Sequence, residues 1–210
     1  MPDIIYDKYP VVALDMFLPE VMLEIPELPE DIAMHYVREA AIEFATRAHV
    51  LERTVTICKQ DCVQDYILEP PDCTRLVAVQ HICAEGCCGG PVTRLSTRPC
   101  VLSCGTAYSW FEEPNIIHIT GGASRYDVRI SVAPRRDACE LPEKLYERYK
   151  TDVQTGAFAK LYGVPRRAWS SQGLADSRRA EFDRRIASAG IDRLMGHQQG
   201  PIKMKTRRVL

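Results

Sequence analysis

Residues 141–169 read LPEKLYERYKTDVQTGAFAKLYGVPRRAW, and this stretch decides the fold of the second half of the chain. The proline and glutamate at positions 142 and 143 are typical of the first turn of a helix. Gly163 and Pro165 form a stop signal at its other end. In between, apolar residues recur at the three- and four-residue spacing of a helix with one buried face: Leu145, Tyr149, Val153, Ala157, Phe158 and Leu161.

Two more helices are predicted, one on each side of this stretch. The first starts at Pro29, which suits a first helical turn, and ends near His49 to Leu51. The last runs from about Leu174 to Leu194 and carries arginines outside its apolar stripe. That stripe consists of Leu174, Ala175, Phe182, Ile186, Ala189 and Leu194. Because a single helix cannot bury its stripe alone, we expect the three helices to form a small bundle.

Residues 52–133 lack the helical period and contain β-prone segments separated by turn residues. These segments are 54–58, 66–68, 76–82, 109–111, 116–119 and 126–132. Gly121-Gly122 lies between the last two segments and predicts a hairpin that joins them. The region is therefore interpreted as an antiparallel β-module inserted into the helical bundle.

The two ends of the chain differ in character. Residues 1–28 are rich in proline and acid, which excludes a long helix, but they contain too many apolar residues for a free tail. We expect an extended arm that packs either on its own domain or on a neighbouring subunit. Residues 197–210 form a basic tail. The predicted fold is α+β, with the bundle at 29–51 and 134–196 and the β-module at 52–133.

Composition excludes some classes of protein. With 46% hydrophobic and 26% charged residues, the chain is not intrinsically disordered, and no apolar run is long enough to cross a membrane. The net charge of −1 hides a segregation. From Lys160 onward there are 12 Lys+Arg and 4 Asp+Glu, a net of +8, so residues 1–159 carry a net of −9. Such a division points to partners rather than to a particular fold.

The nine cysteines and five histidines suggest chemistry without defining a site. The first residues lack the features of a signal peptide, so we expect free thiols in a reducing cytosol; disulfides would require an oxidising exterior. Cys87, Cys88, Cys100 and Cys104 would supply four zinc ligands, but no CxxC pair occurs. We interpret the cysteines mainly as packing residues, and His81 and His118 as hydrogen-bonded strand residues. No catalytic, cofactor or metal site is predicted.

The helical residues after position 133 resemble a pattern found in tailed phages. The matching positions are Leu141, Pro142, Leu145, Tyr149, Gly156, Ala157, Leu161, Pro165, Trp169 and Phe182. The acidic, proline-containing lead from Val21 to Pro29, followed by a helix with Arg38-Glu39-Ala40-Ala41 and Phe44, fits as well. The pattern is similar to that of the head-to-tail adaptors of short-tailed bacteriophages, the tail tubular protein A group. The match to this family in residues 52–133 is limited to the presence of a β-module at this place in the chain. The cysteines of the module are not part of the family pattern.

The resemblance implies a structural virion protein and not an enzyme. Family members form a dodecameric ring that joins the portal protein to the tail nozzle or tail tube and leaves a channel for DNA during genome ejection. The virion would be assembled in the host cytoplasm, without a cofactor and without a membrane. The acidic first part of the chain (residues 1–159) and the basic part from Lys160 onward have opposite charges, which favours head-to-tail contacts between neighbouring copies in such a ring.

The resemblance also assigns roles to residues. The partner-binding surface for the portal would consist of Arg178, Arg179, Arg184, Arg185, Lys203, Lys205, Arg207, Arg208 and Leu210. Helix packing would depend on Leu145, Gly156, Ala157, Leu161, Trp169 and Phe182. Two alternatives remain open. The basic C-terminal third suits a nucleic-acid-binding regulatory protein, and the cysteines suit a cysteine- or zinc-dependent enzyme.

Overall fold

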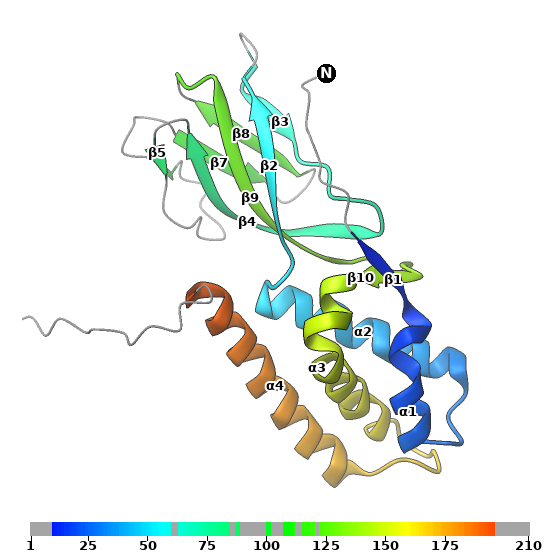
Figure 1. Cartoon of the computed structure of the whole chain (residues 1–210). Coiled ribbons are helices and arrows are strands. Elements are labelled where there is room, and N and C mark those ends of the chain that lie inside the picture. Colours follow the sequence, from blue (N-terminus) through cyan, green and yellow to red (C-terminus); the bar gives the residue numbers. More distant parts are fainter. Residues whose placement is uncertain are drawn as a thin grey trace, which may run out of the picture.

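The protein consists of a helical bundle and a β-module that projects from one end of it (Figure 1). The computed structural model describes residues 10–59, 63–84, 87–88, 100–101, 107–111, 115–120 and 122–195. Helices and antiparallel sheets both occur, so the expected α+β class is confirmed. One hydrophobic core runs through both parts, since buried residues of the helices and of the strands belong to the same cluster.

Three long helices build the bundle: α2 (Glu30–Ala48), α3 (Glu143–Tyr162) and α4 (Gln172–Met195). Their bounds lie within about three residues of those predicted, because the turn residues act as expected. Pro29 caps the start of α2, and His49 ends this helix with a left-handed backbone (φ 53°). Gly163 follows α3. Helix α3 lies between α2 and α4 and packs against both.

The N-terminal arm departs from the prediction. Residues Val11–Ala13 form strand β1, Leu14–Phe17 a 3-10 turn (η1) and Leu18–Glu24 a short helix, α1. The expectation of an extended arm is therefore wrong over Leu14–Glu24. Pro19 is compatible with α1 because it occupies the first turn, where a backbone N–H has no helical partner. Phe17 and Val21 are fully buried, so the described part of the arm packs on its own chain.

A short two-stranded ribbon ties this arm to the start of α3. Strand β1 pairs antiparallel with β10 (Glu140–Pro142), with Val11 opposite Pro142 and Ala13 opposite Glu140. Strand β10 was not predicted, because the Leu141-Pro142-Glu143 signal marks the helix start and says nothing of the residues before it. The ribbon fixes the direction in which α3 leaves the β-module.

The β-module contains two antiparallel sheets. The first has the order β2 (Glu52–Cys58), β9 (Arg125–Pro134), β4 (Thr74–Ala84) and β5 (Cys87–Cys88). The second has the order β3 (Asp65–Ile67), β8 (Ile116–Thr120), β7 (Ala107–Phe111) and β6 (Cys100–Val101). Val55, Ile57, Val128 and Ile130 of the first sheet are fully buried, and Ile117 and Ile119 of the second are nearly so.

The predicted hairpin at Gly121-Gly122 is wrong. Strands β8 and β9 lie in different sheets, so the chain crosses from one sheet to the other at this point instead of pairing with itself. Glycine signals a change of chain direction, but it does not determine which strand the next segment joins.

Candidate partner-binding surface

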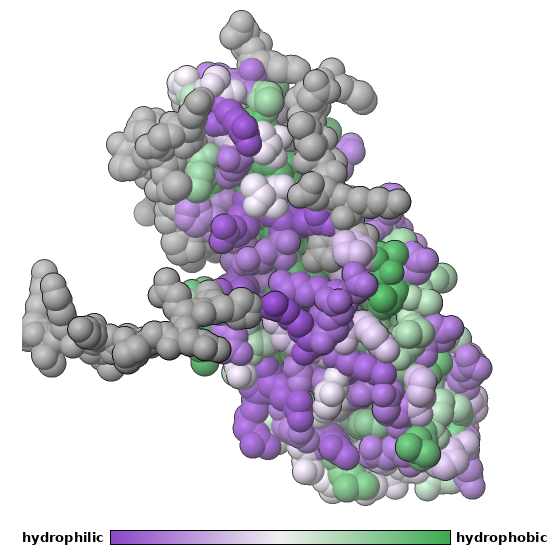
Figure 2. All heavy atoms as spheres, in the orientation of Figure 1, coloured by the Kyte–Doolittle hydropathy of each residue, from purple (hydrophilic) through white to green (hydrophobic). Residues whose placement is uncertain are grey.

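The residues predicted to bind a partner fall into two groups. Lys203, Lys205, Arg207, Arg208 and Leu210 lie outside the described residues. The four arginines of the other group lie on α4. Figure 2 shows that the face of the bundle turned to the viewer is largely hydrophilic. The contacts of the four arginines decide whether they form a free cationic surface.

Arg178 and Arg185 contact carboxylates of their own chain. Arg178 Nη2 lies 3.1 Å from Glu24 Oε1 of α1, and its guanidinium lies over the Phe158 ring. Arg185 Nη1 lies 2.5 Å from Asp152 Oδ1 of α3, and Nη2 lies 2.7 Å from Glu181. Charge-assisted contacts of this kind hold α4 against the elements beside it.

Arg179 belongs to a cluster centred on Glu43 of α2. Arg179 Nη2 lies 2.6 Å from Glu43 Oε1, and Lys160 Nζ of α3 lies 2.9 Å from the other carboxylate oxygen. Partial burial raises the pKa of Glu43, but the hydrogen bonds from Arg179 and Lys160 outweigh that effect and lower it to about 2. The carboxylate stays charged at neutral pH and joins α2, α3 and α4.

Arg184 differs from the other three. It is exposed, and its Nε donates a hydrogen bond to the Ala180 carbonyl oxygen at 3.3 Å. Within the described part of the chain it makes no ion pair. Of the four α4 arginines predicted to bind a partner, Arg184 is therefore the one that is exposed to solvent without a carboxylate among the described residues to neutralise its charge.

The C-terminal end of α4 exposes apolar side chains. Ile191 is 52% exposed, Leu194 75% and Met195 48%. The expected stripe is therefore wrong at Leu194, and also at Leu174, which is 49% exposed. The helical spacing could have predicted this exposure. Steps of three and four residues from Phe182 lead to Ile186, Ala189 and then position 193, so the buried face passes through position 193 and not through Leu194.

Position 193 anchors this end of the helix. Arg193 Nη1 lies 3.1 Å from Glu52 Oε1 at the start of β2. The end of α4 is thereby held beside the β-module, and the basic residues 197–210 follow from this point. Sequence reasoning missed this anchor and the acidic partners Glu24, Glu43 and Asp152.

Two of the predicted packing residues, Gly156 of α3 and Phe182 of α4, meet between these helices. A Cβ atom on Gly156 would lie 2.6 Å from two ring atoms of Phe182, so only glycine lets the helices approach this closely here. Leu145, Ala157, Leu161 and Phe182 are fully buried. Trp169 lies in the turn between the helices, where it is half-buried and its ring is 5.9 Å from the Arg167 guanidinium.

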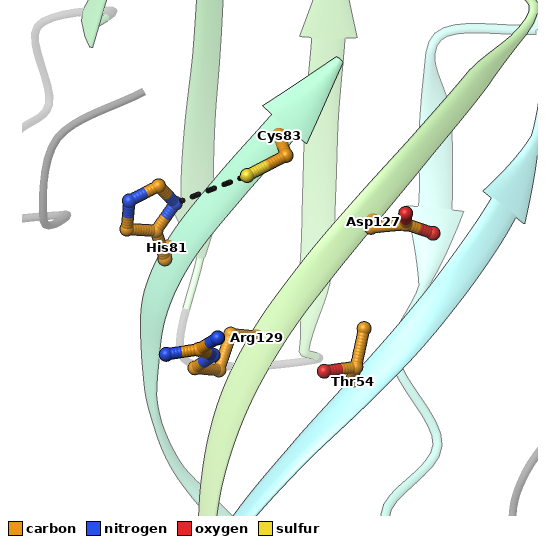
Figure 3. Close-up of a pocket in the computed structure, with 5 residues that line it drawn as sticks. All are labelled: Thr54, His81, Cys83, Asp127 and Arg129. Carbon is orange, nitrogen blue, oxygen red and sulfur yellow. Dashed lines mark hydrogen bonds between the residues drawn. The ribbon is translucent and has the colours of Figure 1, made fainter. Parts of the chain in front are cut away.

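The outer face of the first sheet holds a pocket of about 250 Å³ lined by polar side chains from three strands, which Figure 3 shows. They are Thr54, His81, Cys83, Asp127 and Arg129. Arg129 stands opposite both Thr54 of β2 and His81 of β4, and Asp127 stands opposite Cys83. His81 Nδ1 lies 3.6 Å from Cys83 Sγ.

The exposure of several cysteines contradicts the expectation that they are packing residues. Cys58 and Cys73 of the β-module are exposed, so the interpretation of the cysteines as packing residues of this module is wrong for these two. Cys83 is half-buried, and Cys139, which follows the module, is exposed. Cys58 is the last residue of β2 and points away from the core. The side chains of Cys87, Cys88, Cys100 and Cys104 lie outside the described part. His118 Nδ1 contacts Asp65 Oδ1 at 2.6 Å.

Among the described residues, no three potential metal ligands gather, and no helix is both long and apolar enough to cross a membrane. A scan against models of protein families and a search of curated proteins find no match to the chain.

Proposed function

We propose that the chain is a structural virion protein, a head-to-tail adaptor of a short-tailed bacteriophage. Copies of it form a ring, expected to be dodecameric, between the portal protein and the tail nozzle or tail tube. DNA passes through the ring without sequence recognition. The protein has no catalytic role in this proposal.

The residues that carry the resemblance support this proposal through their contacts. Gly156 of α3 lies against the ring of Phe182 of α4, and Leu145 and Leu161 are fully buried elsewhere along α3. The pattern shared with the adaptor family thus describes how two helices pack. A shared packing pattern favours a shared helical frame, on which partner contacts depend.

The observation that carries the proposal is the exposed end of α4. Ile191, Leu194 and Met195 form an apolar surface that the described part of the chain leaves uncovered. The basic segment 197–210 continues directly from it. An apolar helix end followed by a basic tail fits a groove on a partner, with the apolar residues as anchors and the cations as steering groups.

The ion pairs of α4 disfavour the alternative that the protein binds nucleic acid. Arg178, Arg179 and Arg185 are each engaged by carboxylates of the same chain. A cation that already neutralises an internal carboxylate releases fewer counterions from DNA than a free one. The α4 face is therefore a poor phosphate-binding surface.

Removal of residues Pro201 to Leu210 tests the role of the tail. The truncated chain should keep its far-UV circular dichroism spectrum, because the last residue of the described core is Ala189 and α4 ends at Met195. It should no longer attach to portal rings encoded by the same genome, as measured by native mass spectrometry and by electron microscopy of the mixture. The full chain should add a symmetric ring to the portal.

A matched pair of variants separates the tail from the helix end. Leu194→Asp places a charge on the exposed apolar surface and should weaken portal attachment by at least tenfold. Ser177→Asp changes an exposed position near the other end of α4 and should leave attachment unaltered. Attachment that survives both the truncation and Leu194→Asp would overturn the proposal.

A further inference from the structure

The pocket on the outer face of the first sheet brings a thiol, an imidazole and a guanidinium together (Figure 3). His81 and Cys83 stand two residues apart on β4, so both side chains lie on the same face of the sheet. Both are half-buried, and the sulfur of Cys83 is a thiol and not part of a disulfide. The adaptor role uses none of these groups.

The imidazole is placed to take the proton of the thiol. His81 Nδ1 lies 3.6 Å from Cys83 Sγ, which is a hydrogen-bonding distance when sulfur is one of the partners. A thiol reacts as a nucleophile only after it loses its proton, because the thiolate is the reactive form. An imidazole in contact with the sulfur accepts that proton and so activates the thiol.

An anion-binding row of side chains lies next to this pair. Arg129 of β9 stands directly opposite Thr54 of β2 on one side and His81 of β4 on the other. Directly opposite residues of antiparallel strands are about 5 Å apart at Cβ, so the three side chains form one row across the sheet. Arg129 is exposed and makes no ion pair within the described residues, so its guanidinium is available to bind a carboxylate of a ligand. The Thr54 hydroxyl can donate a further hydrogen bond.

The carboxylate of Asp127 does not cancel this charge. Asp127 lines the pocket opposite Cys83, but it accepts a hydrogen bond from Thr56 at 2.7 Å and pairs with Arg125 at 3.3 Å. Its charge is thus already offset by partners on its own side of the row. The pocket therefore keeps an excess of positive charge at Arg129.

These groups suit one reaction better than others. Exchange between a thiol and a disulfide needs a thiolate and a proton acceptor, and it needs no oxyanion site because the charge passes from one sulfur to another. The described lining offers these two groups and an anchor for an anion. A pocket of about 250 Å³ holds one arm of a small molecule.

We propose that Cys83 is a site of thiol–disulfide exchange with small disulfides that carry a carboxylate. Arg129 and Thr54 bind the carboxylate. His81 takes the thiol proton, and the Cys83 sulfur attacks one sulfur of the disulfide. That disulfide bond breaks, a new one forms to Cys83, and the departing thiolate takes the proton from His81. Cys83 is oxidised and the departing half is reduced, so the step needs no other oxidant.

The test uses the full-length protein, reduced and then separated from the reductant, and two aromatic disulfides. Dithiobis(nitrobenzoate) carries a carboxylate on each ring, and dithiodipyridine is uncharged. Each is added in an amount below that of the protein, and mass spectrometry of peptides identifies the labelled thiol. Cys83 should be labelled ahead of the more exposed Cys58, Cys73 and Cys139, because none of these three is hydrogen-bonded to an imidazole of the described residues. Labelling of any other cysteine ahead of Cys83 would overturn the proposal.

Two variants separate the roles of the neighbouring side chains. His81→Gln should slow the labelling of Cys83 by both reagents about tenfold or more, because the proton acceptor is lost. Arg129→Gln should slow labelling by dithiobis(nitrobenzoate) about threefold to fivefold, the effect of one partly exposed ion pair, and leave dithiodipyridine unaffected. Such a change in the ratio of the two rates is not imitated by loss of folding, which acts on both reagents.

Arg75→Gln is the matched control for the charge. It removes the same charge from an exposed position of β4 outside the pocket, so the ratio of the two rates should equal that of the wild type. An equal ratio in wild type and Arg129→Gln would overturn the proposal, as would an unchanged rate in His81→Gln. The portal contact at the end of α4 is not involved in any of these measurements.

Discussion

Gly156 sets the distance between α3 and α4. Replacement by alanine places a methyl group 2.6 Å from the ring of Phe182, which is fully buried and must shift to accommodate it. Overpacking of a core costs about 1–3 kcal/mol, and better helix propensity returns at most about 1 kcal/mol. We expect Gly156→Ala to lower the free energy of unfolding by about 1–2 kcal/mol, measured by urea denaturation.

Gly190 on α4 is the control for that substitution. Its nearest neighbour to a new Cβ is the Ala48 carbonyl oxygen at 3.9 Å, an ordinary contact. Gly190→Ala should therefore stabilise the protein by about 0.5–1 kcal/mol. If both alanine variants were stabilised alike, the close approach at Gly156 would not limit the packing of the helices.

Glu43 makes stability depend on pH. Its pKa in the folded protein is lowered to about 2 from an ordinary value of 4.5, so its ionised form contributes about 3 kcal/mol above pH 4.5. This contribution is lost as pH falls from about 4.5 toward 2. Glu43→Gln should be less stable than wild type at pH 7, and the difference should shrink as the pH approaches 2, in urea unfolding at each pH.

Glu39 provides the comparison on the same helix. It makes no ion pair within the described residues, so Glu39→Gln should follow the wild-type dependence on pH. Parallel pH profiles for wild type and Glu43→Gln would show that the cluster around Glu43 does not stabilise the fold.

At the scale of elements, η1 and α1 are part of the core and not a detachable arm. Phe17 is fully buried, its ring lies 5.4 Å from that of Tyr146, and its carbonyl oxygen accepts a hydrogen bond from Gln154. Phe17→Ala should cost about 3–5 kcal/mol in thermal or urea unfolding. Met16→Ala, at the adjacent residue that is 46% exposed, should change stability by less than about 1 kcal/mol.

The helices could be predicted from sequence because their signals are local. Proline and glycine mark the ends of α3, and its apolar spacing identifies the buried face. The strands could be found by composition, but their partners could not, since pairing depends on which sheet each segment joins. The separation of β8 from β9 and the β1–β10 ribbon are both of this kind. The short helix α1 was missed because proline was weighed only as a helix breaker.

At the scale of the whole molecule, the division of charge in the sequence is partly cancelled by the fold. Arg178, Arg179 and Arg193 from the basic end meet Glu24, Glu43 and Glu52 from the acidic part. Sequence reasoning located the helix that carries the candidate surface but not which of its charges are free, because the neutralising carboxylates lie more than a hundred residues away in the chain. The exposed end of α4 was missed although the helical spacing, which leads from Phe182 through Ala189 to position 193 and not to Leu194, could have indicated it.

The β-module leaves the bundle and returns to it through one pair of strands. Glu52 at the start of β2 stands opposite Ser131 near the end of β9, so the two crossing points are about 5 Å apart. A segment joined to its host in this way can be replaced during evolution by one of another length without moving the helices. Recombination between genes can therefore give the tip of such a protein a new specificity while the helical frame is inherited unchanged.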